Sequence, residues 1–213
     1  MNKSKIKICG IKNIKTLDCC IKNKVDFFGL IFYKKSPRNI NIKDALNLIQ
    51  HSKNKKIKSV GVFVNEPINR LNLLLHKLKV DYVQLHGNED DRYIYEIKKL
   101  NSIKVIKNIP IQNSEDLLII KNYTNADMFL FDYKPKENEL PGGNSKQFSW
   151  ELIKNIEIGK PWFISGGINI GNINKIINFT IPYGIDISSG VEEKPGIKNN
   201  NKITSLIKFY ESK

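Results

Sequence analysis

Short apolar runs recur along the whole chain, and each is followed by a segment of mixed polar and apolar residues. Most runs are rich in Ile, Val and Phe and are apolar at successive positions. Continuous apolar patterning is typical of parallel strands that are buried on both faces of a sheet. We therefore predict eight strands, at Lys5–Cys9, Phe27–Phe32, Ile57–Val64, Tyr82–Leu85, Ile103–Ile106, Met128–Tyr133, Pro161–Ile164 and Gly184–Ile187.

The segments between the runs are predicted to be helices. Their apolar residues recur at intervals of three and four, which places them on one face of a helix. Pro67 is placed for a helix first turn, where its missing N–H costs little. Leu117–Ile120 is the exception, because it is apolar without a helical period. The clearest stripes are Leu71, Leu74, Leu75 and Leu78; Ala45, Leu46 and Ile49; and Ile203, Leu206, Ile207 and Tyr210.

The order of strand and then helix runs through the chain without a linker, a shift in composition or a low-complexity tail. Its 213 residues lie near the lower end of what one α/β barrel requires. We predict a single domain over residues 1–213 that folds as a (β/α)8 TIM barrel. An open doubly wound sheet is the alternative topology for this pattern.

The formal net charge of +14 suggests a nucleic-acid partner, because clustered Lys and Arg neutralise phosphates. The basic residues are nearly all Lys, however, and no basic block is interleaved with aromatic residues. This scatter favours solvated faces, and a diffuse positive field would speed the capture of a small anionic substrate. We expect a small phosphorylated substrate and no nucleic acid. A non-catalytic basic barrel that binds nucleic acid remains the alternative from another functional class.

The lengths of the apolar runs and the spacing of the cysteines also indicate the cell compartment. No apolar run approaches the roughly 18 residues needed to cross a bilayer, and no signal-peptide hydrophobic segment begins the chain. The three cysteines include the adjacent pair Cys19 and Cys20 in a predicted helix, with no Cys-x-x-Cys spacing. We expect a cytoplasmic protein without a membrane partner, either a monomer or a homodimer.

Cys9 and Asp132 end the first and sixth predicted strands. Active sites of such barrels are built at the carboxyl ends of the strands, so both side chains would point into the barrel mouth. Each has an ordinary structural explanation, since free cysteines are commonly buried and an aspartate at a strand end often binds a backbone amide. Their positions favour function. Cys9 would act as a thiolate base if a positive neighbour lowered its pKa.

Two further features at the strand ends suit anions. Arg38 follows Pro37, which fixes the loop backbone, and its planar guanidinium suits a carboxylate. Glycine-bearing segments at 165–168 and 188–190 follow the last two strands, where such barrels often hold phosphate on backbone N–H groups. We interpret His86 and the loop at Asn65 as structural, without an acid or base role. The candidate phosphate ligands are Gly166, Gly167, Ser189 and Gly190.

Taken together and in order, these motifs resemble the phosphoribosylanthranilate isomerase family over essentially the whole chain. Single motifs recur in other phosphate-binding barrels, but the first and last of the set together are distinctive of the family. The set is Lys-Ile-Cys-Gly-Ile at 7–11, Ser-Pro-Arg at 36–38, Val-Gly-Val-Phe-Val-Asn at 60–65, Gln-Leu-His-Gly at 84–87, Phe-Asp at 131–132 with Gly-Gly at 142–143, Ser-Gly-Gly-Ile at 165–168 and Gly-Ile-Asp-Ile-Ser-Ser-Gly-Val-Glu at 184–192.

The resemblance implies an Amadori rearrangement of N-(5-phosphoribosyl)anthranilate to 1-(2-carboxyphenylamino)-1-deoxyribulose 5-phosphate, in tryptophan biosynthesis. It implies that Cys9 is the general base, that Asp132 is the general acid and that Arg38 holds the anthranilate carboxylate. The phosphate would lie on the backbone of the four glycine-loop residues, and no cofactor or metal would be required.

Other phosphate-binding barrels are the competing enzyme interpretation. Indole-glycerol-phosphate synthase would need a catalytic lysine and glutamate at strand ends. The tryptophan synthase α chain is another member of this class. A ribulose-phosphate epimerase would need two aspartates and metal-binding histidines, and the chain has only three histidines.

The chain departs from the family pattern at three places. Gly142-Gly143-Asn144-Ser145 stands where the family usually reads Gly-Gly-Thr-Gly, and Phe148-Ser149-Trp150 stands where it reads Phe-Asp-Trp. These departures concern the motion of that loop and its entry into the following helix. Lys198-Asn199 replaces the family's Lys-Asp, which removes a possible charge contact at the start of the last helix.

Overall fold

The computed structural model describes residues 3–139, 142, 146–154 and 157–213. Its parallel strands follow one another around a closed barrel in chain order, and β1 pairs with β8 to complete it. The predicted (β/α)8 TIM barrel is therefore confirmed. The strands are β1 (Lys5–Cys9), β2 (Phe27–Ile31), β3 (Lys58–Phe63), β4 (Tyr82–Leu85), β5 (Lys104–Ile111), β6 (Met128–Tyr133), β7 (Trp162–Ile164) and β8 (Gly184–Ile187).

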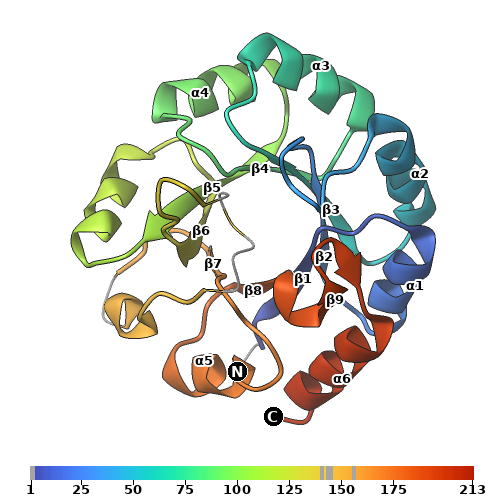
Figure 1. Ribbon diagram of the computed structural model, residues 1–213. Helices are drawn as coiled ribbons and strands as arrows, with labels where there is room; N and C mark the ends of the chain where they lie inside the picture. The colour runs from blue at the N-terminus through green and yellow to red at the C-terminus, as the bar shows by residue number, and fades with distance from the viewer. Residues whose placement is uncertain (1–2, 140–141, 143–145, 155–156) are drawn as a thin grey trace.

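Figure 1 shows the helices as a ring around these strands. Their apolar stripes pack against the outside of the barrel, and Leu71 of the predicted stripe is fully buried there. The α-helices are α1 (Ile14–Lys22), α2 (Ile42–Ser52), α3 (Ile68–Leu78), α4 (Asp91–Leu100), α5 (Ile173–Phe179) and α6 (Asn200–Glu211). Three 3-10 helices, η1 (Glu115–Asn122), η2 (Trp150–Ile153) and η3 (Ser189–Val191), and a hairpin of β9 (Glu192–Lys194) and β10 (Ile197–Lys198) complete the described elements.

A second, smaller apolar cluster fills the inside of the barrel. Successive side chains of a strand point to opposite faces, so alternate residues reach the interior. At the amino-terminal end of the barrel, the ring of Phe27 packs in a T-shaped arrangement against the rings of Tyr82 and Phe163. In each pair the two ring centroids are 5.4 Å apart. This aromatic packing fills that end. The interior cluster is Cys9, Phe27, Val60, Val62, Ile106, Met128, Leu130 and Phe163.

Polar side chains occupy the same inward-facing positions nearer the carboxyl ends of the strands. In the strand register, Lys7 lies opposite Asp186, and Cys9 lies opposite Gly29. Lys7 and Cys9 are two residues apart on β1, so they share the inner face. The barrel therefore changes from an apolar interior to a charged one toward its carboxyl end.

Strand β5 extends beyond its predicted end at Ile106. Its second half contains Lys107 and Asn108, which interrupt the apolar pattern although both are buried. Lys107 is satisfied inside the protein, because its Nζ lies 3.0 Å from Glu89 Oε2 and donates to the carbonyl of Gly87. A buried ion pair thus conceals a strand from pattern analysis.

The segments after β5 and β6 differ from the α-helices that follow the other strands. The run Leu117–Ile120, which lacks a helical period, lies in the 3-10 helix η1. Among its described residues, the segment after β6 contains only the short η2. Ser149 precedes η2 but makes no side-chain cap hydrogen bond. Pro67 lies at the N-cap of α3, one residue before the predicted first turn. Asn144 and Ser145 lie outside the described residues.

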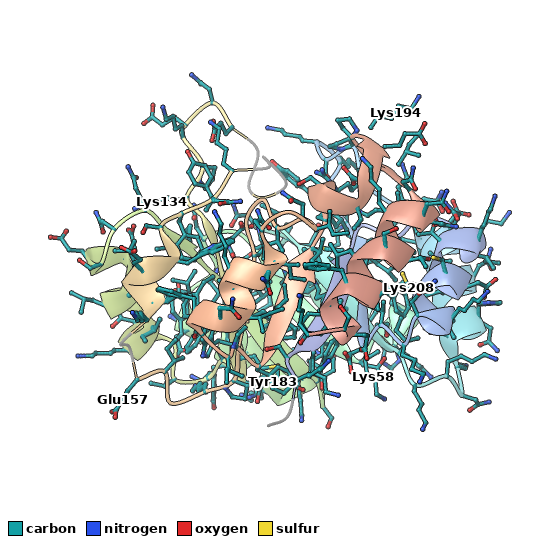
Figure 2. The ribbon with its side chains drawn as sticks, turned by 90° about the horizontal axis from the view of Figure 1, so that it is seen from below. Lys58, Lys134, Glu157, Tyr183, Lys194 and Lys208 are labelled. Carbon is teal, nitrogen blue, oxygen red and sulfur yellow. The ribbon has the colours of Figure 1, made fainter. Side chains whose placement is uncertain are left out.

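The basic side chains are spread around the molecule. Lys58, Lys134, Lys194 and Lys208 project at different ends and sides in Figure 2. Among the described residues, none of the helices combines the length and apolar character needed to span a bilayer.

Asn199 keeps the cap of the last helix that the family pattern places on an aspartate. Its side-chain oxygen accepts hydrogen bonds from the N–H groups of Asn201 and Lys202, at 2.9 and 3.1 Å. Asparagine and aspartate are similarly good N-caps. The departure at this position therefore removes a charge without removing the cap.

We expect Asn199→Ala to lower the free energy of unfolding by about 1 kcal/mol, because two N–H groups lose their acceptor. Urea denaturation of the purified variant measures this. Asn199→Asp is the matched control and should unfold within about 0.5 kcal/mol of the wild type. Equal losses in both variants would show that the cap hydrogen bonds do not stabilise α6.

Candidate active site

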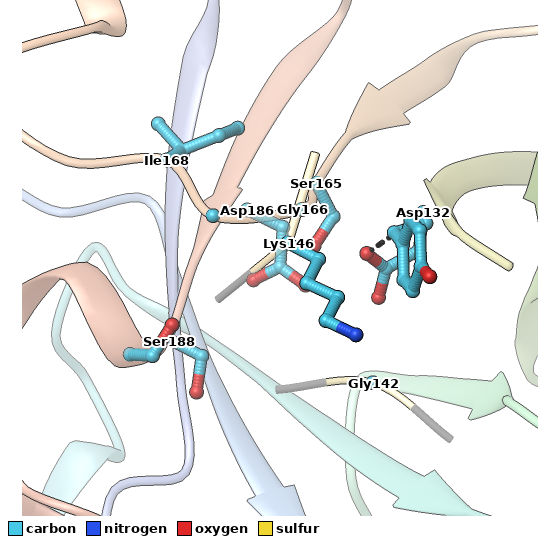
Figure 3. Close-up of a pocket in the computed structure, with 11 residues that line it drawn as sticks. Asp132, Gly142, Lys146, Ser165, Gly166, Ile168, Asp186 and Ser188 are labelled. Carbon is cyan, nitrogen blue, oxygen red and sulfur yellow. Dashed lines mark hydrogen bonds between the residues drawn. The ribbon is translucent and has the colours of Figure 1, made fainter. Parts of the chain in front are cut away.

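Two adjoining cavities lie at the carboxyl ends of the strands. The first, of about 50 Å³, is lined by Cys9, Arg38 and Asp132 among other residues. The second, of about 20 Å³, is lined by Asp132 together with the loops that follow β7 and β8 (Figure 3). The structure therefore brings the predicted acid, base and arginine to one cavity. Gly166, Gly167 and Ser189 line the other.

Cys9 is buried beside Lys7 at the end of β1. Burial raises the pKa of the Cys9 thiol, and Asp186 raises it further, while Lys7 and Lys198 lower it. The net shift is upward, because burial outweighs the lowering by the positive neighbours on which the thiolate interpretation depends. Lys7 is itself held 2.8 Å from Asp186 Oδ2, so its charge is shared with that carboxylate.

Gly29 on β2 provides the space that the Cys9 side chain occupies. A Cβ atom at this position would lie 2.6 Å from Cys9 Sγ and 3.1 Å from Cys9 Cα. The close pairing of β1 and β2 leaves no alternative position for the strand backbone. The Gly29–Cys9 register is thus a steric requirement of the site.

Asp132 is buried at the end of β6. Its Oδ1 accepts a hydrogen bond of 2.8 Å from the N–H of Tyr133. Burial raises the pKa of Asp132 to about 7, against the opposing effects of the Tyr133 hydrogen bond and of Lys7. A carboxyl group with this pKa can carry a proton at neutral pH, which a general acid must do.

His86 lies beside Asp132 but has no charge to offer it. Burial, together with the positive charges of Lys7 and Lys107, lowers the pKa of His86 to about 3. Gln84 Nε2 donates to His86 Nδ1 over 2.9 Å, and His86 Nε2 lies 3.7 Å from Asp132 Oδ2, beyond hydrogen-bond distance. The neutral ring agrees with the interpretation of His86 as structural.

Arg38 is buried in the loop that follows β2, and its guanidinium forms a two-point ion pair. Nε and Nη2 donate to the two carboxylate oxygens of Glu192 on β9, each over 2.8 Å. Lys198 Nζ donates to Glu192 Oε1, also over 2.8 Å. The fork geometry expected for a carboxylate is present, and an internal carboxylate occupies two of its donors.

Burial and these contacts shift the pKa values of Glu192 and Lys198. Burial opposes ionisation of Glu192, but Arg38 and Lys198 together lower its pKa. Burial lowers the pKa of Lys198, which Glu192 counteracts. We take Glu192 and Lys198 as an ion pair, because their 2.8 Å contact stabilises both charges.

The loops after β7 and β8 have the backbone geometry of an anion site. Gly166 and Gly167 have φ angles of +95° and +61°, in the left-handed region that favours glycine. Within the described part of the chain, neither of their N–H groups donates to a backbone or side-chain acceptor. Gly190 does not line this cavity; a Cβ there would lie 1.9 Å from the Ile168 carbonyl oxygen, so glycine lets the two loops touch.

Several site residues received no role from sequence reasoning. Three of them, Lys7, Asp186 and Glu192, lie inside the quoted motifs, and Lys198 lies in the departure at 198–199. Their pairing, however, depends on the barrel. For Lys7 and Asp186, the sequence does offer a signal, because each is a charged residue at a strand position that faces the barrel interior. Lys146 was not singled out either, although it lines the phosphate-side cavity and pairs with Glu139.

Comparisons with known proteins agree with this geometry. The family model described as N-(5′-phosphoribosyl)anthranilate (PRA) isomerase matches residues 6–209. An N-(5′-phosphoribosyl)anthranilate isomerase of Rhizobium johnstonii is 39% identical over 208 residues, which cover 97% of this chain and 93% of that protein.

Two solved structures share the fold over nearly the full length. The phosphoribosyl anthranilate isomerase of Thermotoga maritima is 31% identical with a TM-score of 0.88, covering 99% of this chain and 100% of that one. A phosphoribosyl anthranilate isomerase in complex with reduced 1-(o-carboxyphenylamino)-1-deoxyribulose 5-phosphate is 29% identical with a TM-score of 0.83, at the same coverage.

The buried Asp132 carboxyl should cost stability as the pH rises. Its folded pKa of about 7 lies above the unfolded value of about 3.9, so its contribution is fully present below pH 4 and is lost through pH 7. Asp132→Asn removes this loss and keeps an acceptor for the Tyr133 N–H. We expect the variant to gain stability relative to the wild type between pH 4 and 7, by up to about 4 kcal/mol.

Urea denaturation at pH 4, 5.5, 7 and 8.5 measures this difference. Glu137→Gln, at an exposed position, is the control and should show little pH-dependent change. A difference between Asp132→Asn and wild type that stays constant with pH would contradict the raised pKa.

Proposed function

Because this chain belongs to the N-(5′-phosphoribosyl)anthranilate isomerase family, we propose that Cys9 and Asp132 carry out the proton transfers of its isomerisation. It is an isomerase of tryptophan biosynthesis. The family assignment removes the other phosphate-binding barrels as interpretations. The proposed substrate is N-(5-phosphoribosyl)anthranilate, and the product is 1-(2-carboxyphenylamino)-1-deoxyribulose 5-phosphate.

The observation that carries the proposal is one cavity lined by both Cys9 and Asp132, in which burial raises the pKa of Asp132. Asp132 holds a proton up to about pH 7 and gives it to the ribose ring oxygen. As the C1′–O4′ bond breaks, the nitrogen lone pair forms the C1′=N bond of a protonated Schiff base. Asp132 ends this step as a carboxylate.

Cys9 acts next, as a thiolate. It takes the proton from C2′, and the electron pair of that C–H bond forms C1′=C2′ while the Schiff-base pair returns to nitrogen. The resulting enolamine becomes the ketone when C1′ gains a proton and the 2′-hydroxyl loses one. Lys7 and Lys198 favour the thiolate, and the positive Schiff base favours it further at the moment the base is needed.

The two ends of the substrate match the two cavities. Arg38 lines the cavity of Cys9 and would face the anthranilate carboxylate, while Gly166, Gly167 and Ser189 line the cavity proposed for the phosphate. Gly190 would keep the two phosphate loops in contact. Holding both ends places C2′ near the base, and such positioning supplies several kcal/mol of barrier reduction.

The cavities must widen when substrate binds. Volumes of about 50 and 20 Å³ hold a few water molecules, whereas pockets for organic ligands are on the order of 300 Å³ or more. The segment after β6 contributes Gly142 to both walls and Lys146 to one. We therefore expect Gly142 and Lys146 to move outward as the substrate enters.

The roles of the two residues are tested by pH profiles of variants. The active form carries a Cys9 thiolate and a protonated Asp132, so we expect Cys9→Ser and Asp132→Asn each to lower kcat/KM by about 10²- to 10⁴-fold. Residual activity of Cys9→Ser should fall above pH 7, as Asp132 loses its proton. Residual activity of Asp132→Asn should rise between pH 7 and 9, as more thiolate forms.

The decay of anthranilate fluorescence, with enzymatically generated substrate, reports the rate. Flat profiles between pH 7 and 9 in both variants would reverse the assignment, making Asp132 the base and Cys9 the acid. Circular dichroism of each variant separates loss of chemistry from loss of fold.

A further inference from the structure

We propose that Glu192 and Lys198 set the charge that Arg38 presents to the substrate, and so determine the preference of this site for a carboxylated ligand. The inference rests on the proposed function, in which Arg38 faces the anthranilate carboxylate. It assigns roles in substrate binding to two buried charged residues that do not themselves transfer a proton.

The three side chains form a compact buried cluster. Glu192 Oε1 accepts from both Arg38 Nε and Lys198 Nζ, and Oε2 accepts from Arg38 Nη2, each over 2.8 Å. Their side chains are only 7%, 5% and 2% exposed, in the order Arg38, Glu192, Lys198. Glu192 and Lys198 face each other across the β9–β10 hairpin, where they are paired in the strand register. The hairpin therefore fixes both charges against Arg38.

The net charge of the cluster depends on Lys198. Arg38 and Glu192 alone would sum to zero, and Glu192 would repel an incoming carboxylate. Lys198 restores one positive charge, which matches the single negative charge of an anthranilate carboxylate. The neighbouring pair Lys7 and Asp186 adds no net charge. Away from water, one unbalanced charge has a large effect on ligand affinity.

Lys198 also connects this cluster to the rest of the site. Its Nζ donates to the carbonyl oxygen and to Oγ of Ser188, at 3.0 and 3.2 Å, and Ser188 Oγ donates to the Cys9 carbonyl at 3.1 Å. Ser188 lines both cavities. Glu192 is thus a positioning residue that fixes the guanidinium plane, and Lys198 balances its charge at the wall of the site.

A purely structural role for the cluster makes a different prediction. If the ion pairs only fastened the hairpin to the barrel, removing either charge would weaken the binding of every ligand, and removing both would be at least as harmful. If the net charge of the cluster sets the carboxylate preference, removing the charges of both Glu192 and Lys198 should preserve that preference. Arg38 alone then carries the same net charge as the native cluster. The double variant separates the two explanations.

The experiment measures binding of two inert ligands by calorimetry. One is reduced 1-(o-carboxyphenylamino)-1-deoxyribulose 5-phosphate, and the other is the same compound without its carboxylate. The ratio of the two Kd values is the carboxylate preference. Lys198→Met should reduce this preference roughly tenfold or more, and should change the Kd of the compound without carboxylate by less than about threefold.

Two further variants complete the test. Glu192→Gln with Lys198→Met should restore the preference to within about threefold of the wild type, because Arg38 supplies the single positive charge. Glu192→Gln alone should keep or increase the preference, and it decides the question if Lys198→Met does not fold. A double variant as poor as Lys198→Met, or a loss of preference in Glu192→Gln, overturns the proposal.

Isomerase turnover of the wild type, measured in parallel, keeps the two proposals apart. Turnover with an unchanged carboxylate preference in Lys198→Met would overturn the charge role alone. No turnover of N-(5-phosphoribosyl)anthranilate by the wild type would overturn the proposed function itself.

Discussion

The whole site depends on the cost of holding ionisable side chains inside the mouth of a barrel, where little water reaches them. Most of these groups are stabilised by an opposite charge at hydrogen-bond distance, as Lys7 is by Asp186 and Lys107 is by Glu89. Asp132 is different, because it accepts a hydrogen bond from the backbone N–H of Tyr133 and burial is the largest effect on its pKa. The same physical cost that destabilises a charged Asp132 keeps a proton on it near neutral pH.

The barrel architecture explains why paired and unpaired groups lie side by side. Each strand sends alternate residues inward, so Lys7 and Cys9 reach the interior from β1, and Asp186 meets Lys7 from β8. The paired charges hold the loops and the guanidinium of Arg38 in place. The two groups whose pKa values burial raises remain available for proton transfer. Stability and activity are therefore opposed at Asp132, where an uncharged side chain would favour the fold and abolish the acid.

The sequence was most informative where the pattern was simple. Five predicted strands end at the observed residue, because continuous apolar runs mark strands that are buried on both faces. Cys9, Asp132 and the two glycine loops all follow or end predicted strands. This was enough to predict that they lie at the same end of the barrel.

Other features needed the three-dimensional arrangement. Arg38 and Glu192 are 154 residues apart in the chain, so no local signal joins them. The β9–β10 hairpin is short and polar and carries no apolar period. The direction of the Cys9 pKa shift depends on how deeply the thiol is buried, which a list of its charged neighbours does not reveal. The second half of β5 was not predicted either, because Lys107 interrupts its apolar pattern. Lys107 can be buried in a strand because it forms an ion pair with Glu89.

The central claim is that burial keeps Asp132 protonated near neutral pH, and a direct titration of its carboxyl tests it most directly. Carbon-13 NMR of aspartate-labelled protein, with the Asp132 signal assigned by its absence in Asp132→Asn, follows the carboxyl carbon from pH 3 to 9. The account predicts a midpoint of about 7 in the free enzyme. A midpoint near the ordinary aspartate value of about 3.9 would contradict it, because Asp132 would then reach the substrate as a carboxylate with no proton to give.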